Sequence, residues 1–379
     1  MTSSHPPSRA AGRPTAPPWL GPLQALVANP LPAVAAAGLA GLVGAHPSSY
    51  ARSPRMWARA FAVLGIDAVY LPLDVPAGGL AAVLALLRRT DSALGVNVTV
   101  PYKEAVVPLL DALEPEAASI GAVNTVTRAR GGRLVGANTD GAGLLDALQR
   151  PGDGLPLVPR LEDLVVLLIG AGGAARAAAF ALAPHLAEGQ LLITNRHLAR
   201  AQALAAAVRA SGGRAEAVGD DALDDVLPGV RLVINASVRG QAGIVARDDG
   251  WTLLEPYSAL APASPPVLPA QDAAAFAAAF AAQAAADLAA NHARSRARMR
   301  LLPPDAVVYD MIYAPRETTT MRHAREAGLR TAGGRWMNIA QAVCACLDHL
   351  CRDALAARGI DPAAVRPVVT RAMAEAWGE

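Results

Sequence analysis

Residues 165–176 read VVLLIGAGGAAR, and this stretch decides the fold of the 379-residue chain. Its five leading apolar residues are typical of a strand that is covered on both faces, as in a parallel sheet between layers of helices. The strand continues into a glycine-rich turn, and an alanine-rich helical segment follows. A strand, a glycine-rich turn and a helix in this order predict a Rossmann-type α/β domain.

The glycine-rich turn also predicts a dinucleotide site. Gly170, Gly172 and Ala175 match the G-x-G-x-x-G/A spacing, in which the first glycine permits the tight turn and the second lets the backbone approach a pyrophosphate. The helix N-terminus that follows offers free N–H groups to the same anion. The residues expected to contact the cofactor here are Gly170, Ala171, Gly172, Gly173 and Ala174.

The next strand indicates which dinucleotide binds. Residues 190–194 form an apolar strand that ends in Asn195-Arg196-His197, with Arg200 close behind. NAD sites place a carboxylate here to hold the ribose 2′-hydroxyl, whereas guanidinium groups suit a 2′-phosphate. We therefore expect NADP(H), with Asn195, Arg196 and Arg200 at its adenosine end. The alternative is that the two arginines only begin a solvated helix.

A second α/β unit precedes this one. Apolar runs at 39–44, 68–73 and 93–98 predict strands, and the segments at 53–61 and 79–89 predict the helices between them. Further strands at 231–234 and 306–309 extend the Rossmann-type unit. The sequence therefore predicts an α/β protein of two domains, each with a mainly parallel sheet, and a ligand cleft between them.

Composition excludes several kinds of partner. The chain is 53% hydrophobic, and its 34 basic and 32 acidic residues leave a net charge of +2. We expect a globular protein that binds neither nucleic acid nor an anionic membrane surface. No apolar stretch of membrane-spanning length with clean boundaries is evident. Cys344, Cys346 and Cys351 are too few for a disulfide framework and have no metal-ligand spacing, so we expect buried, reduced thiols.

Two regions lie outside this α/β pattern. Residues 1–36 contain many prolines and no acidic residue, and we interpret them as a flexible extension of a cytoplasmic protein rather than a targeting segment, because the prolines would break the helix that targeting requires. Residues 242–304 combine a proline-rich loop with an alanine-rich helix at 273–299, which ends in several arginines. We interpret them as a surface insertion with a solvated basic end; a dedicated interaction element is the alternative.

The chain contains one lysine, Lys103. Lysine can lose its proton near neutral pH when it is buried, whereas arginine stays charged, so a lone lysine among arginines is a candidate acid/base catalyst. Asn124 and Asp140 each follow a predicted strand end, where open α/β sheets bind ligands. Singly, Asn and Asp beside glycine are most often turn formers, and the lone lysine could reflect composition alone.

Several segments together resemble the shikimate dehydrogenase family, which includes quinate and aminoshikimate dehydrogenases. They follow the family's order between residues 40 and 352. The matching stretches are 97–104 (NVTVPYKE), 121–125 (GAVNT), 138–140 (NTD), 170–173 (GAGG), 195–196 (NR), 310–315 (DMIYAP) and 337–342 (MNIAQA).

The resemblance implies an N-terminal substrate domain, residues 37–141, completed by residues 335–379, and an NADP domain over residues 142–334. It implies reversible reduction of 3-dehydroshikimate to shikimate with NADPH, a small polyol acid as substrate, no metal, and a monomer or homodimer. Lys103 and Asp140 would be the catalytic pair, since a protonated amine can stabilise a developing alkoxide and give it a proton. The implied substrate contacts are Ser53, Asn97, Thr99, Asn124, Tyr313 and Gln341. The implied further cofactor contacts are Ser237, Met311, Gly334 and Met337.

Three departures from the family pattern affect the expected pocket. The family usually has Ser-x-Ser-Pro in the first loop, with both serines on the substrate carboxylate, and this chain has Ala51-Arg52-Ser53-Pro54. Ser48, Ser49 and Tyr50 are the candidate replacements for the missing hydroxyl. Val238 removes a hydroxyl that the family usually has near the expected cofactor, and Arg239 adds a charge there. Trp336 and Asn338 flank Met337, where smaller or apolar residues are usual.

Two alternatives to a shikimate dehydrogenase follow. Ala51 favours a quinate or aminoshikimate dehydrogenase of the same family. A non-catalytic ligand-binding relative, with residues 242–304 as a partner surface, is the alternative of another class. The presence of both Lys103 and Asp140 argues against it.

Overall fold

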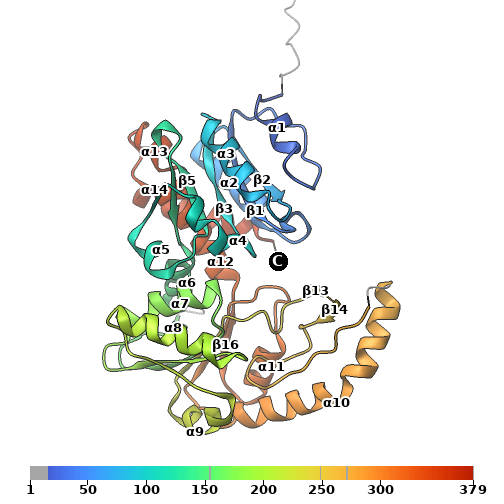
Figure 1. The fold of residues 1–379 in the computed structure, drawn as a ribbon. Coiled ribbons are helices and arrows are strands. Elements are labelled where there is room, and N and C mark those ends of the chain that lie inside the picture. Colours follow the sequence, from blue (N-terminus) through green and yellow to red (C-terminus); the bar gives the residue numbers. More distant parts are fainter. Residues whose placement is uncertain (1–15, 153–154, 248, 270–271, 379) are drawn as a thin grey trace, which may run out of the picture.

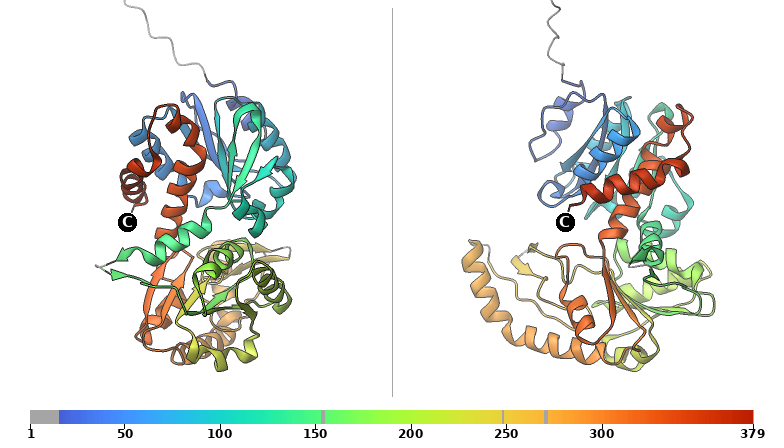
Figure 2. Two further views of the ribbon diagram at one scale, coloured as in Figure 1. Left: turned by 90° about the vertical axis from the view of Figure 1, so that its left-hand side faces the viewer. Right: turned by 180° about the vertical axis from the view of Figure 1, so that it is seen from behind.

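The computed structural model describes residues 16–152, 155–247, 249–269 and 272–378. Two α/β units lie one above the other, and the C-terminal helices return to the first unit (Figure 1). Figure 2 shows these helices beside the N-terminal elements in both views. The predicted two-unit α/β architecture is thus confirmed.

The first unit contains a six-stranded mixed sheet in the order β2-β1-β3-β5-β6-β4. Its elements are β1 (Gly38–Gly44), α2 (Ser53–Leu64), β2 (Ala68–Asp74), α3 (Leu80–Arg89), β3 (Ala93–Val98), α4 (Tyr102–Ala105), β4 (Ala112–Leu113), α5 (Pro115–Ile120), β5 (Thr125–Arg128) and β6 (Leu134–Ala137). The sheet is mainly parallel, as expected, except at β5, which runs antiparallel to both β3 and β6. The five residues between β5 and β6 are too few for the crossover that parallel neighbours require.

The second unit contains a six-stranded sheet in which all neighbours are parallel, in the order β11-β10-β9-β12-β15-β16. This is the order of a complete Rossmann fold, and its ligand crevice lies where the order reverses, at the carboxyl ends of β9 and β12. The elements are β9 (Val165–Ile169), α7 (Gly173–Leu182), β10 (Gln190–Thr194), α8 (Leu198–Ala210), β11 (Ala215–Ala217), α9 (Leu223–Val226), β12 (Leu232–Asn235), β15 (Val307–Asp310), α11 (Thr319–Glu326) and β16 (Arg330–Gly333).

Two helices connect the units. α6 (Asp140–Gln149) leads out of the first unit and packs against α12 (Arg335–Cys344), which leads back into it. Their close approach depends on Gly143, since a Cβ there would lie 2.7 Å from the carbonyl oxygen of Met337. A short hairpin of β7 (Pro151–Gly152) and β8 (Leu155–Pro156) follows α6. Because α6 is continuous from Asp140, the domain boundary expected after residue 141 falls inside a helix.

The C-terminal helices complete the core of the first unit. They are a π-helical segment (Ala345–Leu350), α13 (Arg352–Ala356) and α14 (Pro362–Ala376). Val369 and Met373 of α14 share a buried cluster with Trp57 and Phe61 of α2. All three cysteines are free; Cys346 and Cys351 are buried, and Cys344 is partly buried.

The segment before β1 is packed rather than flexible from residue 16 onward. Trp19, Leu23 and Val27 recur every four residues through and beyond α1 (Leu20–Gln24), and all three are buried against the first sheet. Asn29 donates to the carbonyl oxygen of Pro72 and accepts from the backbone N–H of Asp74. The expected flexible extension is therefore wrong for residues 16–36. Residues 1–15 lie outside the described part of the chain.

Residues 242–304 form a folded unit on the Rossmann-type domain. A hairpin of β13 (Ile244–Arg247) and β14 (Gly250–Leu253) is followed by α10 (Ala273–Met299), drawn as a long orange helix in Figure 1. Phe276 and Phe280 of α10 share a small core with Tyr257 and Leu268. By length and composition alone α10 could cross a membrane, although no stretch of membrane-spanning length was expected from the sequence. The face of α10 that carries Phe276 and Phe280 packs against residues of the same segment.

The basic end of α10 is solvated as expected at Arg294 and Arg296, which are 46% and 40% exposed, but not at Arg298. The side chain of Arg298 is fully buried, and its guanidinium pairs with Asp220 at 2.6 Å and Asp224 at 2.8 Å. It also donates to the carbonyl oxygen of Leu260. The acidic segment around residues 220–225 therefore holds the end of α10 against the Rossmann-type unit.

Candidate active site

A cavity of about 200 Å³ lies between the two units and is lined by residues of both. Every substrate or catalytic residue expected from the sequence lines it, as do four of the expected cofactor residues. They are Ser53, Asn97, Thr99, Lys103, Asn124, Asp140, Tyr313 and Gln341, with Ala174, Met311, Gly334 and Met337.

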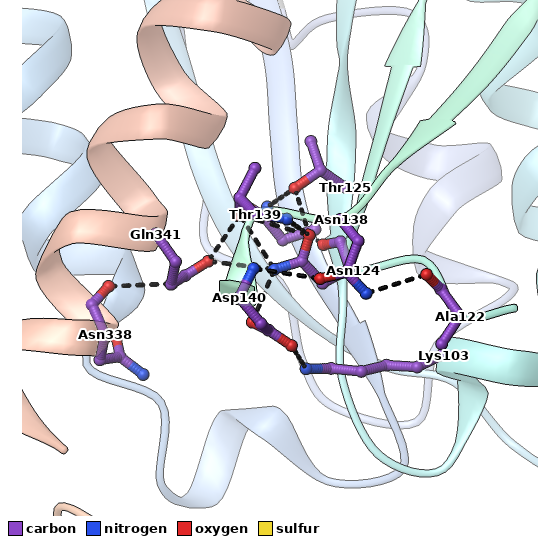
Figure 3. A network of polar contacts seen from close by, with 10 residues as sticks. Lys103, Ala122, Asn124, Thr125, Asn138, Thr139, Asp140, Asn338 and Gln341 are labelled. Atoms are coloured by element: carbon purple, nitrogen blue, oxygen red, sulfur yellow. Dashed lines mark hydrogen bonds and ion pairs between the residues drawn. The ribbon is translucent and has the colours of Figure 1, made fainter. Parts of the chain in front are cut away.

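An ion pair between Lys103 and Asp140 lies in this cavity (Figure 3). Lys103 comes from α4, and Asp140 is the first residue of α6, where the helix dipole favours a carboxylate. Lys103 Nζ lies 2.5 Å from Asp140 Oδ2, and the two side chains are 19% and 8% exposed. The amine therefore remains accessible to a small molecule while the carboxylate is almost covered.

A network of amides and hydroxyls fixes the second oxygen of Asp140. Asn124 Nδ2 donates to Asp140 Oδ1 at 2.7 Å, and the backbone N–H of Thr139 donates to Asn124 Oδ1 at 2.9 Å. Gln341 of α12 accepts from the Thr139 hydroxyl at 3.3 Å, which joins the C-terminal helices to the network (Figure 3). Both carboxylate oxygens of Asp140 thus accept hydrogen bonds, and these bonds hold the carboxylate in a single orientation.

Asn97 lines the cavity, but its amide is engaged by the protein. Its Nδ2 donates to Thr125 Oγ1 at 3.0 Å and to the carbonyl oxygen of Asn124 at 3.2 Å, and its Oδ1 accepts from the Tyr70 hydroxyl at 2.8 Å. Tyr70 stacks on Trp57 at 4.7 Å between ring centroids. Asn97 therefore positions Asn124 and the cavity wall as well as facing the cavity. Trp57 and Tyr70 also line the cavity. Neither was expected there, because each fits the apolar pattern of its own helix or strand.

The loop before α2 forms another part of the wall. Tyr50, Ala51, Arg52 and Ser53 all line the cavity. Tyr50 was a candidate replacement for the missing serine hydroxyl, whereas Arg52 was not expected to face the site. The only sequence signal for Arg52 is its place between the two serine positions of the family pattern.

Tyr313 closes the cavity beside this loop. Its ring packs edge-on against Trp377 at 5.2 Å between centroids. Burial raises the pKa of the Tyr313 hydroxyl to about 12, so the phenol stays protonated and able to donate a hydrogen bond near neutral pH. Trp377 was not identified from the sequence, which has no motif around it.

The glycine-rich turn has the space that a dinucleotide requires. Gly170 has φ +124°, and a Cβ there would lie 3.0 Å from the carbonyl oxygen of Ala236 at the end of β12. A Cβ at Gly172 would meet nothing within 4 Å, and α7 begins directly afterwards without a capping side chain. A Cβ at Gly173 would be 3.8 Å from the Lys103 side chain. Residues 170–174 therefore fit a pyrophosphate next to the lysine.

Comparison with known proteins agrees with this geometry. The profile of the shikimate dehydrogenase substrate binding domain matches residues 43–126. Shikimate dehydrogenase (NADP(+)) of Symbiobacterium thermophilum is 35% identical over 80% of this chain and 86% of its own. This chain belongs to the shikimate dehydrogenase family.

Solved structures of family members have the same fold. The shikimate 5-dehydrogenase of Thermus thermophilus in complex with NADP(H) and shikimate is 30% identical, with a TM-score of 0.58 over 88% of this chain and 99% of that one. The quinate dehydrogenase of Corynebacterium glutamicum in complex with NAD is 27% identical, with a TM-score of 0.61 over 87% of this chain and 97% of that one.

The remaining expected cofactor residues lie outside the cavity, along the carboxyl edge of the Rossmann sheet. Asn195, Arg196 and Arg200 follow β10, and both arginines are exposed and make no ion pair with a described residue. Arg200 stands in the first turn of α8, where the helix dipole disfavours a cation. An arginine without an ion-pair partner at this helix start does not stabilise the helix, whereas it could bind an anion. Ser237 follows β12, and its hydroxyl donates to Asn235 Oδ1 at 2.7 Å.

Of the other departures from the family pattern, Asn338 lines the cavity, as expected from its place beside Met337, whereas Trp336 and Arg239 lie away from it. Trp336 does not line it; its ring is stacked by Arg150 at 4.5 Å on the outside of the α6–α12 pair. The expectation that Trp336 reshapes the pocket is therefore wrong, because it and Met337 are on different faces of α12. Arg239 turns toward residues 242–304, where its guanidinium donates to the carbonyl oxygen of Ala261, and burial lowers its pKa.

Proposed function

We propose that this protein is an NADP-dependent shikimate dehydrogenase, which catalyses the reversible reduction of 3-dehydroshikimate to shikimate. The observation that carries the proposal is the Lys103–Asp140 pair, held in a small polar cavity beside the glycine-rich turn. The names of the relatives, including one solved with NADP(H) and shikimate, support this activity.

The chain's own residues supply the proton. When bound, the cofactor provides or accepts the hydride. Lys103 lines the cavity, where its amine would lie beside the substrate oxygen, stabilise the developing alkoxide by its positive charge and complete the alcohol with its proton. In the oxidative direction the amine takes the hydroxyl proton. Asp140 keeps the amine in place through their ion pair.

The surrounding polar residues orient the substrate. Asn124 and Thr139 hold Asp140 in one orientation, and Gln341, Thr99 and Ser53 present further polar groups to the cavity. A ring with several hydroxyl groups suits such a lining, since each hydroxyl both donates and accepts hydrogen bonds. We assign the substrate-binding role to residues 37–141 and 335–379.

The proposed cofactor site runs from the cavity to the end of β10. Residues 170–174 would hold the pyrophosphate, Ser237, Met311, Gly334 and Met337 would surround the nicotinamide end, and Asn195, Arg196 and Arg200 would bind the 2′-phosphate. We further propose a cytoplasmic monomer or homodimer that acts on a small polyol acid and binds neither nucleic acid nor membrane.

The test is a panel of shikimate, quinate and aminoshikimate with NADP⁺ and with NAD⁺, assayed by absorbance of the reduced cofactor. We expect the highest kcat/KM for shikimate with NADP⁺. Ala51 favours the second candidate, a quinate or aminoshikimate dehydrogenase, and a higher kcat/KM for either substrate would establish it. Binding of these acids without turnover would overturn the proposal in favour of a non-catalytic relative.

A further inference from the structure

Arg52 supplies the one excess positive charge in the cavity. Among the described residues that line it, the charged side chains are Arg52, Lys103 and Asp140. Lys103 and Asp140 form an ion pair and neutralise each other. A substrate carboxylate therefore meets an uncompensated cation only at Arg52.

The two serines near this loop cannot replace the missing hydroxyl. The Ser48 hydroxyl donates to Asp74 Oδ2 at 2.5 Å, and the Ser49 hydroxyl donates to the carbonyl oxygen of His46 at 2.8 Å. Neither residue lines the cavity, and Ala51, which does, has no hydroxyl. Tyr50 and Arg52 are the loop residues left to interact with an anion beside Ser53.

Arg52 also stands at the start of α2, a 12-residue helix whose N-terminus has no capping side chain. Arg52 is the N-cap residue and Ser53 is the first residue of the helix, so the free N–H groups of this turn lie beside the Ser53 hydroxyl. The helix dipole and these N–H groups favour an anion at the same place as the guanidinium.

The guanidinium of Arg52 is fixed in position, but most of its N–H groups have no partner among the described residues. Its Nη1 donates to the carbonyl oxygen of Trp377 at 3.1 Å, and its carbon lies 5.6 Å from the centre of the Trp377 ring. No other hydrogen-bond partner of Arg52 is present in the described part of the chain. Trp377 in turn packs on Tyr313, so Arg52 is fixed beside the cavity while several of its N–H groups remain free.

We propose that Arg52, together with Ser53 and the N-terminus of α2, binds the carboxylate of the substrate in place of the absent first serine. This inference rests on the proposed function and deepens it. A guanidinium contributes a full positive charge, whereas a serine contributes one hydrogen bond. We therefore expect the site to bind an acid more tightly than a neutral analogue.

The experiment compares shikimate with its neutral carboxamide in the wild type and in Arg52→Ala, by calorimetric binding to the cofactor-free protein and by steady-state kinetics with NADP⁺. Removing a charge-assisted hydrogen bond should weaken shikimate binding and raise its KM by about 10- to 100-fold, with kcat changed by less than about threefold. The carboxamide should bind the variant and the wild type alike. Arg52→Lys should recover part of the preference for the acid, which a purely structural role would not predict.

Arg55→Ala is the matched control, because Arg55 is an exposed arginine of the same helix turn that does not line the cavity; its preference for the acid should equal that of the wild type. Retention of the full preference in Arg52→Ala, or its loss in Tyr50→Phe instead, would overturn the assignment. Failure of the proposed function gives a different result: the wild type would bind the acid through Arg52 but oxidise none of it.

Discussion

Lys103 Nζ and Asp140 Oδ2 are 2.5 Å apart, although the two residues belong to different helices and are separated by β4, α5, β5 and β6. The pairing depends on the antiparallel β5–β6 hairpin, which returns the chain to the edge where α4 begins. Asn124 precedes β5 and Asp140 follows β6, so the hairpin presents both polar residues to Lys103. The reacting amine is therefore positioned by sheet topology rather than by local sequence.

The first prediction concerns this pair. Lys103→Ala should lower kcat by about 10²- to 10⁴-fold, the usual contribution of a general acid or base. Asp140→Asn should also lower kcat, because the amide cannot hold the amine by charge. NADPH binding, measured by fluorescence titration, should be unchanged in both. Lys103→Arg is the matched control, since it keeps the charge but holds its proton; wild-type turnover in this variant would contradict proton transfer by residue 103.

The second prediction uses the fact that Lys103 is the only lysine. An amine-directed reagent has two targets in the whole chain, Lys103 and the N-terminus, and peptide mapping can count them separately. Modification of Lys103 should abolish activity, and shikimate should slow that modification without affecting the N-terminus. If shikimate slowed the modification of Lys103 and of the N-terminus equally, the protection would not come from binding in the cavity.

The sequence was sufficient for the parts of the fold that follow local rules. The strand at residues 165–169 and the glycine turn could be identified because burial on both faces and the pyrophosphate each impose a local pattern. The roles of Arg52 and Arg298 could not be identified in this way, since each depends on partners far away in the chain: Trp377 for one, Asp220 and Asp224 for the other. Residues 16–36 were misinterpreted for a different reason. Their prolines masked an apolar repeat, at Trp19, Leu23 and Val27, that packs on the first sheet.

The third prediction concerns cofactor choice. Arg196→Ala should raise KM for NADP⁺ by about 10- to 100-fold, as expected for loss of a charge-assisted hydrogen bond to a phosphate. KM for NAD⁺ should stay within about twofold, because NAD⁺ lacks the 2′-phosphate. Arg214→Ala is a suitable control, since Arg214 is an exposed arginine of the same domain that pairs with Glu188. A parallel loss of both cofactors in Arg196→Ala would contradict a role in phosphate recognition.

The fourth prediction concerns pH and His323. This side chain is 1% exposed, and burial, followed by the charges of Arg296 and His292, lowers its pKa from 6.5 to about 4. The unfolded chain therefore binds a proton more readily, so stability is lost as the pH falls from about 6.5 toward 4. Between pH 7 and pH 5 the loss from this residue is about 2 kcal/mol.

His323→Gln removes this loss, and thermal or urea unfolding at both pH values measures it. The variant should lose about 2 kcal/mol less than the wild type between pH 7 and pH 5. Asp310 acts in the opposite direction, since burial raises its pKa to about 6 and acid then favours the folded state. Asp310 is present in both proteins, so the difference between their pH-dependent losses of stability reports on His323 alone. Identical pH profiles would show that His323 is not held neutral in the folded protein.

The fifth prediction concerns the attachment of α10. Arg298 is fully buried and pairs with Asp220 and Asp224, whereas Arg294, one turn earlier, is 46% exposed and pairs with Asp224 alone. Arg298→Met leaves Asp220 and the Leu260 carbonyl without their donor and removes one of the two arginines that pair with Asp224, and we expect a loss of about 2 to 3 kcal/mol in the free energy of unfolding. Arg294→Met should cost less than about 1 kcal/mol, since exposed pairs contribute little. Because neither residue lines the active-site cavity, kcat should be unchanged in both variants at a temperature where they are folded. Urea unfolding measures the difference, and equal stability of the two variants would mean that the buried pairs do not hold the helix to the domain.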